Sequence, residues 1–488
     1  MTTTLAIDLA AEADTTRLGR ALSSVLQAGD CVLLVGPIGA GKTHLARAFI
    51  RARLGDAEEV PSPTFTLVQT YPADPEIWHA DLYRLTHSDE VVELGLEDAF
   101  ASAICLIEWP DRLGAILPPQ PIRVFLEPAG EGRRATLTFD GRPDLAATVL
   151  QDLQKQHRAD AMHDFLTHAG WAKAAHTLLA GDASTRRYER LRLQNSSAVL
   201  MDAAPGGVDS VADFSKIARH LHAIGLSAPK ILAEDATQGF MLLEDLGDNL
   251  YPHQIAAEPS LELPLYTAAT DVLLHLQSAP PPAGLPNQSA TAWAEAAALV
   301  IDFYRKAVLG NADGRSEFVT TLTAALIRHA DGPRVMILRD YHAENLLWLP
   351  ERKGLARVGL LDFQLGQMGQ PGYDLVSLLQ DARRSVPIAV EAAMIDRFAK
   401  ARGLDPDQFQ TAYATLGAQR ALRILGIFAK LARDGKTRYI AMTPHVWDQL
   451  QRNLADPALT GLRDICARWL PSPDASALQK LEASCVFR

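Results

Sequence analysis

The sequence predicts an α/β fold with a largely parallel sheet for residues 1–150 and an α+β, two-lobed fold for the rest. The chain has 488 residues, which is more than one hydrophobic core usually serves. Up to about residue 150, short apolar runs of strand length alternate with helical patterns. Beyond residue 160, strand patterns come first and helical patterns follow. The length suggests about three units, and this order predicts an α/β unit followed by a strand-rich lobe and a helical lobe.

The composition is that of an ordinary globular protein, with 48% apolar and 22% charged residues. The 47 Lys and Arg against 58 Asp and Glu give a net charge of -11, which argues against broad nonspecific binding to nucleic acid or anionic lipid. The four cysteines form no CxxC pair, which excludes a disulfide framework and a sequence-local zinc site. The N-terminus lacks a basic segment, and no apolar run approaches the roughly 20 residues that cross a bilayer. We therefore expect a cytoplasmic protein.

The elements of the first region follow from apolar periodicity. Residues 14–27 form an amphipathic helical pattern, and Cys31–Val35 is a continuous apolar run of strand length. A glycine-rich turn follows it and leads into a helix that extends to about Arg53. Strands separated by helices are typical of an α/β layer fold. Further strand-like runs lie at 65–71, 77–82, 104–108, 122–126 and 135–139.

Polarity rises over residues 151–160, and we interpret this stretch as the linker that ends the first domain, residues 1–150. The alternative is that these residues form the polar last turn of one long helix. Residues 161–250 are expected to form a strand-rich lobe, and residues 251–488 a helical lobe with the catalytic loop. The strand patterns lie at 187–193, 198–202 and 240–243, a helical pattern lies at 211–224, and Pro280–Pro282 mark a loop.

The segment from Gly36 to Thr43 reads GPIGAGKT and fits the phosphate-binding (P-loop) pattern GxxxxGK[ST] between a strand and a helix. Glycines let backbone N–H groups converge on phosphate oxygens, and the positive end of the helix adds to the attraction. Lys42 would bridge the β- and γ-phosphates, and Thr43 would hold Mg²⁺. The alternative is a glycine-rich turn with an incidental Lys-Thr pair. The predicted nucleotide contacts are Gly36, Gly39, Ala40, Gly41, Lys42 and Thr43.

A phosphate-binding loop also needs an acid near the metal. The apolar strand at 103–107 ends in Glu108, a carboxylate that could hold the metal or polarise an attacking water. On its spacing alone, Glu108 could instead be a solvent-exposed acid at a strand end.

Four further segments occur in order along the first region. Together with the glycine-rich turn they resemble the TsaE family of small ATPase subunits, which serve the bacterial machinery that makes threonylcarbamoyladenosine in tRNA. The resemblance covers about residues 5–150 and implies ATP binding and slow hydrolysis with TsaB-like and TsaD-like partners, with tRNA met only indirectly. The segments are residues 62–68, 79–84, 93–96 and 107–110.

The resemblance also implies roles for individual residues. Asp81 and Glu108 become acids of the catalytic site, and Glu108 contacts the metal together with Thr43. Thr64 and Thr66 belong to a switch-like segment. Without the resemblance, Asp81 could belong to an ordinary polar strand face.

A second constellation lies between residues 335 and 363. Asp340 and Asn345 form a DxxxxN pattern after an apolar run, and Asp362 follows seventeen residues after Asn345. This is the order of a kinase catalytic loop and its metal-binding aspartate. Asp340 would accept the proton of a substrate hydroxyl, while Asn345 and Asp362 would hold Mg²⁺ on the nucleotide. The alternative is a surface loop with incidental acids.

Neighbouring segments supply the expected ATP contacts of this second region. A short Gly/Ser turn at 179–188, with Ser184 and Arg187, could fold over the phosphates, and Glu244 lies in a hinge-like strand that could pair with adenine. Asp374 opens a helical pattern, where it suits an N-cap and could tether the catalytic loop.

The usual lysine–glutamate pair of kinases is missing. The strand at 198–202 carries no lysine, and the helix at 211–224 carries no glutamate. Losing both is coherent, because one buried charge without its partner would be costly. The candidate replacements for the lysine are Arg186, Arg187 and Arg190.

The second region resembles the aminoglycoside phosphotransferase family over about residues 161–475, and most of all its AmgK-like kinases of N-acetylmuramate and N-acetylglucosamine. The motifs GDASxRRY, LLEDLG, LRDYHxxN and ILGIF carry the resemblance. It implies a protein-kinase-like bilobal fold and ATP-dependent phosphorylation of the anomeric hydroxyl, as in cell-wall recycling. Leu338 stands where the wider family often has histidine, which favours the sugar-kinase branch.

The sequence thus predicts a fusion of a P-loop ATPase that supports tRNA modification with an amino-sugar kinase, both using ATP and Mg²⁺. One alternative makes one half a non-catalytic nucleotide-binding scaffold. Another keeps the kinase but changes its acceptor to an aminoglycoside, a choline-like alcohol or another small hydroxyl compound. The retained Asp340, Asn345 and Asp362 argue against a pure scaffold in the second half.

Overall fold

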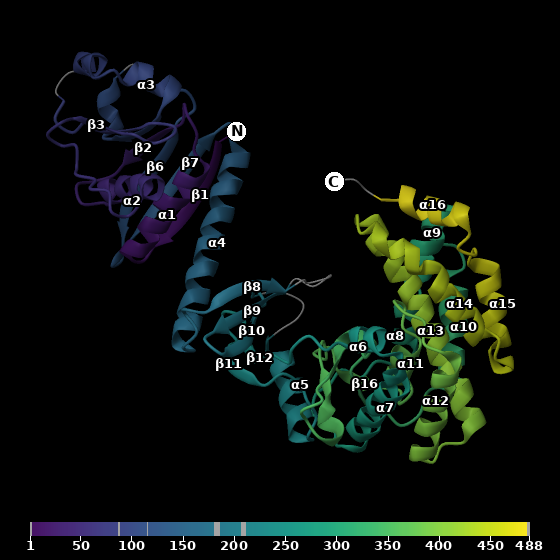
Figure 1. Ribbon diagram of the computed structural model, residues 1–488. Helices are drawn as coiled ribbons and strands as arrows, with labels where there is room; N and C mark the ends of the chain where they lie inside the picture. Colours follow the sequence, from purple (N-terminus) through teal and green to yellow (C-terminus); the bar gives the residue numbers. More distant parts are fainter. Residues whose placement is uncertain (1, 86–87, 115, 180–185, 206–210, 486–488) are drawn as a thin grey trace. The chain divides into compact units, whose positions relative to one another are not determined.

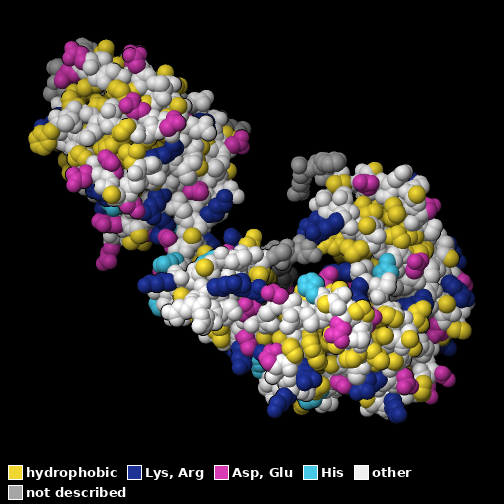
Figure 2. Space-filling model, in the orientation of Figure 1, with side chains coloured by type: hydrophobic (Ala, Val, Ile, Leu, Met, Phe, Trp, Pro, Cys, Tyr) yellow, Lys and Arg dark blue, Asp and Glu magenta, His cyan; other side chains and the backbone are white. Residues whose placement is uncertain are grey.

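The computed structural model describes residues 2–85, 88–114, 116–179, 186–205 and 211–485. The chain divides into two compact units, Met1–Ala172 and Lys173–Arg488, whose elements are labelled in Figure 1. On the face shown in Figure 2, basic and acidic side chains of the described residues are interspersed over both units. Among the described residues, no helix is both long enough and apolar enough to cross a membrane.

A seven-stranded sheet forms the centre of the first unit, which confirms the predicted α/β class. Its centre is parallel, because β2 pairs in parallel with β5 and β6, and β4 with β5. Both edges are antiparallel, so the sheet is mixed rather than largely parallel. The strands in sheet order are β1 (Thr2–Leu9), β7 (Gly132–Asp140), β6 (Ile122–Ala129), β2 (Cys31–Val35), β5 (Ile104–Glu108), β4 (Ile77–Asp81) and β3 (Val68–Tyr71).

A tight turn explains the antiparallel pairing of β6 with β7, and β3 and β1 differ from the sequence prediction. The chain turns back between Ala129 and Gly132, which face each other across β6 and β7, and such a tight turn forces antiparallel pairing. The strand expected over 65–71 begins only at Val68, after Leu67 with a φ of 60°. The sequence patterns did not predict β1, which closes the other edge by pairing with β7.

Helices cover both faces of this sheet (Figure 1), so β2 must be apolar on both sides. Alternate residues of β2 join different cores: Val32 and Leu34 pack with α1, α2 and α4, whereas Cys31 and Leu33 pack with α3. The short turns η1 and η2 complete the unit. The bounds are α1 (Glu12–Val25), α2 (Lys42–Leu54), α3 (Leu96–Ser102), α4 (Pro143–His168), η1 (Ser88–Leu94) and η2 (Pro110–Leu113).

The predicted linker at 151–160 is corrected by the structure. These residues lie inside α4, an uninterrupted helix of 26 residues, and the division between units falls after Ala172. The polarity that suggested a linker belongs to exposed positions of the helix, while Leu153 is buried in the same core as Ala146 and Val149. The alternative of one long helix therefore describes this stretch.

A five-stranded antiparallel sheet and one helix form the strand-rich part of the second unit. Helix α5 packs Phe214, Ile217 and Leu221 against the sheet. The sequence patterns did not predict β8 or β11. The elements are β8 (Ala175–Leu179), β9 (Arg187–Leu193), β10 (Ser196–Asp202), α5 (Val211–Ala223), β11 (Ile231–Asp235) and β12 (Phe240–Glu244), with sheet order β11-β12-β10-β9-β8.

Helices dominate the chain from Tyr251 onward, and two short two-stranded sheets among them flank the predicted catalytic loop. The bilobal kinase-like class is thereby confirmed, and Pro280–Pro282 form a loop between helices as predicted. The helices are α6 (Tyr251–Ala257), α7 (Glu262–Ser278), α8 (Ala290–Ala297), α9 (Lys306–Leu309), α10 (Arg315–His329), α11 (Tyr373–Leu379), α12 (Ile388–Arg402), α13 (Pro406–Arg433), α14 (Thr443–Leu454), α15 (Thr460–Trp469) and α16 (Ala475–Ala483).

Helix α13 runs through this lobe and touches its neighbours closely at Gly426. A Cβ atom there would lie 2.3 Å from the carbonyl carbon of Leu299 and 2.5 Å from the backbone nitrogen of Val300. Backbone atoms cannot rotate aside as a flexible side chain can, so only glycine fits. This contact gives the ILGIF motif a structural reason.

We expect Gly426→Ala to lower the free energy of unfolding of the second unit by about 1–3 kcal/mol, because overpacking a core costs that much. The matched control is Gly461→Ala in α15, where no heavy atom lies within 4 Å of the added methyl group. That change should leave stability equal or slightly higher, since alanine suits a helix better than glycine. Urea unfolding followed by circular dichroism measures both, and equal stability of the two variants would contradict the packing argument.

Candidate functional sites

The glycine-rich turn of the first unit connects β2 to α2 and requires glycine at three positions. Gly36, Gly39 and Gly41 have φ values of 154°, 80° and 101°, which side chains disfavour. A Cβ atom at Gly36 would also lie 2.4 Å from the carbonyl oxygen of Leu126. Ala40 closes the turn by donating its N–H to the Pro37 oxygen at 3.2 Å. The backbone of the predicted P-loop is therefore formed.

Lys42 is folded back over this loop. Its side chain is buried, and its Nζ donates to the carbonyl oxygens of Gly36 at 2.8 Å and Pro37 at 3.0 Å. The Trp109 ring covers the ammonium, with 4.1 Å between Nζ and the ring centroid. Burial lowers the pKa of Lys42, although the nearby charges of Glu108 and Asp81 oppose that shift. A phosphate could take the place of the two carbonyl oxygens without moving the lysine far.

The two predicted acids lie opposite each other at the ends of adjacent parallel strands. Asp81 on β4 and Glu108 on β5 are register partners, and both are buried. Thr43 donates its hydroxyl to Glu108 Oε2 at 3.2 Å. Thr64 donates its hydroxyl to Asp81 Oδ2 at 2.8 Å. The structure thus brings Lys42 and these four side chains to one edge of the sheet.

His79 completes this edge and was not among the predicted site residues. It is fully buried, and its Nε2 lies 3.0 Å from Glu108 Oε1, so the imidazole fixes the carboxylate that also accepts from Thr43. The signal in the sequence was the spacing of two from Asp81, which puts both side chains on one face of β4. Thr66, predicted to belong to the switch-like segment, lies in the exposed turn before β3.

Two short two-stranded sheets lie beside the residues of the second constellation. β13 (Val335–Ile337) pairs with β16 (Gln367–Gly369), and β14 (Leu346–Trp348) pairs with β15 (Val358–Leu360). The side chain of Asn345 donates to the backbone oxygen of Asp340 at 2.8 Å. The backbone oxygen of Asn345 accepts from Leu361, the residue before Asp362, at 2.9 Å. These two bonds tie Asn345 to the backbone of Asp340 and to the residue before Asp362; a shared site for the three side chains stays a prediction.

The backbone is strained at both ends of this cluster. Arg339 and Asp362 have φ values of 71° and 53°, a region that residues with side chains rarely occupy. Asp374 holds the first of these turns by accepting the N–H groups of Leu338 at 2.6 Å and Arg339 at 2.9 Å. Asp374 lies in the first turn of α11 and not at its N-cap, so tethering the loop is the role that its contacts support.

His342, inside the loop, stabilises it. Burial first and then the cations of Arg383 and Arg420 hold the pKa of His342 well below its usual value, so the ring is neutral at pH 7. Its Nε2 accepts from Arg383 Nη1 at 3.2 Å and faces the Asn345 amide nitrogen at 3.3 Å. Arg383 also pairs with Glu344 at 2.8 Å. Arg383 therefore grips the loop at two points, a role that the sequence did not indicate.

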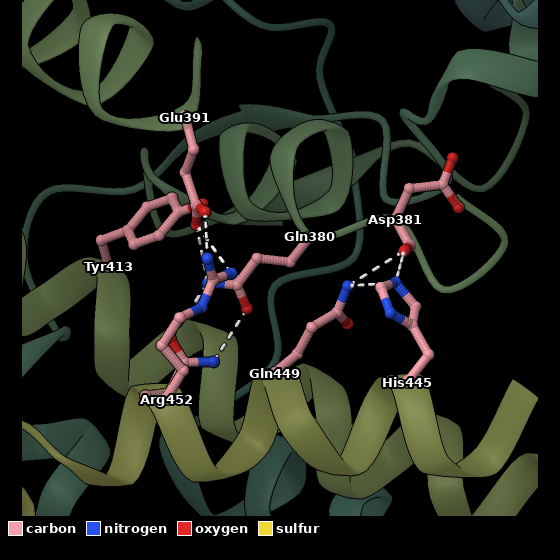
Figure 3. Close-up of polar contacts among 8 residues, drawn as sticks. Gln380, Asp381, Glu391, Tyr413, His445, Gln449 and Arg452 are labelled. Atoms are coloured by element: carbon pink, nitrogen blue, oxygen red, sulfur yellow. Dashed lines mark hydrogen bonds and ion pairs between the residues drawn. The ribbon is translucent and has the colours of Figure 1, made fainter. Parts of the chain in front are cut away.

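Figure 3 shows how the segment before Arg383 is anchored to the helices behind the loop. The backbone oxygen of Asp381 accepts from His445 Nε2 at 3.1 Å and Gln449 Nε2 at 3.0 Å, both on α14. Glu391 on α12 gathers Arg452 at 2.6 Å and the hydroxyl of Tyr413 at 2.9 Å. A charged group buried this deeply requires such partners. The anchor keeps Arg383 in position beside His342.

The predicted ATP contacts of the strand-rich lobe are only partly defined. Ser184 lies outside the described residues. Arg187 is mostly exposed and pairs with Glu189 at 2.8 Å. Glu244 pairs with Arg352 at 2.7 Å, and its second oxygen accepts from the Lys230 N–H at 3.2 Å. Its own N–H donates to the Lys230 oxygen, so its side chain and amide are both engaged within the protein.

Arg190, one of the candidate replacements for the missing lysine, has carboxylate partners. Its guanidinium pairs with Asp245 at 2.9 Å and with Asp248 at 2.8 Å. These two hydrogen-bonded charges raise the pKa of Arg190 further, with Asp248 as the larger cause. A guanidinium committed to two acids has less capacity for phosphate. Arg190 therefore ties β9 to the segment that follows β12.

The oxygen-bearing side chains at both sites suit a hard divalent cation. The first unit offers the Thr43 hydroxyl beside Glu108. The second offers the Asn345 amide oxygen, which its bond to Asp340 leaves unused, and the Asp362 carboxylate, whose Oδ1 accepts from Gln364 at 2.6 Å. Within the described parts of the chain, no three His, Cys, Asp or Glu side chains cluster as a metal site on their own. Such sparse protein ligation is typical of Mg²⁺ held jointly with nucleotide phosphates.

Comparisons with known proteins match the two units separately. Residues 9–136 match the family described as threonylcarbamoyl adenosine biosynthesis protein TsaE, and residues 175–413 match the phosphotransferase enzyme family. An N-acetylmuramate/N-acetylglucosamine kinase of Caulobacter vibrioides is 38% identical over 353 residues, covering 64% of this chain and 97% of that protein. The tRNA threonylcarbamoyladenosine biosynthesis protein TsaE of Rickettsia conorii is 41% identical over 127 residues, covering 26% of this chain and 73% of that protein.

The tether at Asp374 predicts a pH dependence of stability. Burial raises the pKa of Asp374 to about 7, against the opposing effect of its two backbone N–H donors. An unfolded chain releases this proton near pH 4, so between about pH 4 and pH 7 the folded state binds more protons. The free energy of unfolding should therefore fall as the pH rises through this window.

Asp374→Asn has no proton to release and should lack this pH-dependent part of the stability. The difference in free energy of unfolding between the variant and wild type should therefore change between pH 5 and pH 7 and stay constant above pH 7. Urea unfolding at each pH measures it. Asp313→Asn, at an exposed acid of the same unit, should keep the wild-type profile. A stability difference for Asp374→Asn that is independent of pH would contradict the assignment.

Proposed function

We propose a separate activity for each unit of this chain. The chain belongs to the TsaE family through its first unit. Through its second unit it belongs to the phosphotransferase enzyme family, with the N-acetylmuramate/N-acetylglucosamine kinases. The first unit binds and hydrolyses ATP in support of threonylcarbamoyladenosine formation in tRNA. The second transfers the γ-phosphoryl group of ATP to the anomeric hydroxyl of N-acetylmuramate or N-acetylglucosamine. Both activities use Mg²⁺.

The proposal for the first unit is carried by the meeting of Lys42, Thr43, Asp81 and Glu108 at one sheet edge. The N–H groups of the loop and the Lys42 ammonium bind the phosphates. Thr43 would hold Mg²⁺, which would supply charge neutralisation on the phosphates. Glu108, whose Oε1 lies 3.0 Å from His79 Nε2, would hold Mg²⁺ or orient the attacking water. Asp81 stays bound to Thr64, which links this edge to the preceding turn.

The proposal for the second unit is carried by the joining of Asn345 to Asp340 and to the residue before Asp362. Asp340 takes the proton of the sugar hydroxyl as that oxygen bonds to the γ-phosphorus and the bond to ADP breaks. Asn345 and Asp362 hold Mg²⁺, which supplies charge neutralisation on the phosphates. Arg383 and Asp374 keep the loop in the conformation that places Asp340.

The names of the relatives support the choice of substrates and partners. The amino sugar fits a pathway that recovers cell-wall sugars, and the partners of the first unit are TsaB-like and TsaD-like subunits, with tRNA reached through them. Because ATP, tRNA and recovered sugars are available in the cytoplasm, we place the protein there.

Asp340→Asn should lower sugar phosphorylation by about 10²–10⁴-fold, because a positioned general base typically contributes that much. ATP turnover by the first unit should persist. The assay is transfer of the labelled γ-phosphoryl group to a panel of N-acetylmuramate, N-acetylglucosamine, aminoglycosides and choline. Wild-type rates in the variant would remove Asp340 from the mechanism, and transfer to an aminoglycoside or choline alone would replace the proposed acceptor.

Lys42→Ala should abolish ATP turnover by the first unit and its support of tRNA modification, because the P-loop lysine binds the phosphates. Measuring ATP hydrolysis with the partner subunits in an Asp340→Asn background isolates the first site. Sugar phosphorylation by Lys42→Ala alone should be normal. Lys155→Ala, an exposed lysine of α4, should match wild type in both assays. Loss of both activities in Lys42→Ala would show that the two sites are coupled.

A further inference from the structure

The strand topology brings the start of β7 to the same sheet edge as the P-loop. β6 runs parallel to β2, so both strands end at the edge where β2 leads into the loop. β7 returns antiparallel from β6, with Gly132 opposite Ala129, so its first residues lie at that edge too. Arg133 is the second residue of β7. A long cationic side chain therefore begins beside the proposed phosphate site.

Alternation along β7 directs Arg133 toward the helix that follows the loop. Ala135, Leu137 and Phe139 are buried in the core that also contains Leu45 and Phe49 of α2. Because side chains of a strand alternate between faces, Arg133 shares this face with them. Arg134 points to the opposite face, where its Nε pairs with Asp8 at 2.7 Å. Two adjacent arginines thus have different surroundings.

The guanidinium of Arg133 lies over the last glycine of the loop. A Cβ atom at Gly41 would be 3.4 Å from Nε and 3.7 Å from Cζ of Arg133. Gly41 immediately precedes α2, at the positive end of that helix. No carboxylate lies within ion-pair distance of Arg133 among the described residues. Other arginines of this unit do have such partners, for example Arg123 with Asp140 and Arg142 with Asp30.

A cation beside a helix N-terminus, without an acid to balance it, is electrostatically unfavourable unless an anion joins them. We propose that Arg133 is a phosphate-binding residue of the first unit and contacts the phosphate oxygens of the bound nucleotide. It complements Lys42, because guanidinium keeps its charge when buried and can donate two parallel hydrogen bonds to phosphate. This inference rests on the proposed nucleotide binding by the first unit.

The test compares Arg133→Ala with Arg134→Ala in the full chain, with Asp340→Asn present to silence sugar phosphorylation. ATP hydrolysis by the first unit is measured with its partner subunits, and ADP is titrated as a competitor. Arg133→Ala should lower kcat/KM for ATP by about ten- to a hundred-fold, the range of a charge-assisted hydrogen bond. It should weaken inhibition by ADP, and Arg133→Lys should recover part of the loss.

Arg134→Ala should match the parent protein, since its partner Asp8 lies on the other face. Equal kinetics of Arg133→Ala and Arg134→Ala, while Lys42→Ala abolishes turnover, would overturn the role of Arg133 and leave the proposed function intact. If Lys42→Ala also keeps full turnover, the proposed function of the first unit fails, and this inference fails with it.

Discussion

The backbone hydrogen bonds between β4 and β5 hold Asp81 opposite Glu108, and those between β14 and β15 hold Asn345 beside the residue that leads to Asp362. In both units, a register of short strands positions the acids. A slip of one residue would turn each acid to the other face of its strand. The apolar residues that bury these strands on both sides oppose such a slip, because they too would change faces. The same strand register therefore fixes both the buried apolar residues and the positions of the acids.

Both proposed sites also keep strained backbone next to buried polar groups. In the first unit the glycines of the loop take positive φ values at little cost, whereas Leu67 and Trp109 take φ values of 60° and 59° with side chains present. In the second the strain lies at Arg339 and Asp362, where side chains are present and the surroundings must impose the conformation. The hydrogen bonds of Asp374 with the loop backbone and of Arg383 with His342 hold the loop in this conformation. A rigid support of this kind pre-organises acids before substrate arrives.

The glycine-rich and DxxxxN motifs could be predicted from sequence, because each lies within a short run of residues. The family assignments agree with that prediction. Partners supplied from far along the chain could not be foreseen: His79 fixes Glu108, and Arg352 engages Glu244 across 108 residues. The continuous α4 was obscured because polarity along an exposed helix face resembles polarity in a linker. The burial of Leu153 and the contacts of Asp152 and Asp160 with α1 distinguish the two.

The length of α4 has a practical bearing on separating the two activities. A first unit ending at residue 150 would lose Leu153 from its core, the bond from Ser24 to Asp152 and the ion pair from Arg17 to Asp160. It would expose an apolar strip of α1 to water and invite aggregation. Cutting the gene after Ala172 keeps the whole helix with the sheet that it covers. Each half could then be produced without exposing residues of its hydrophobic core.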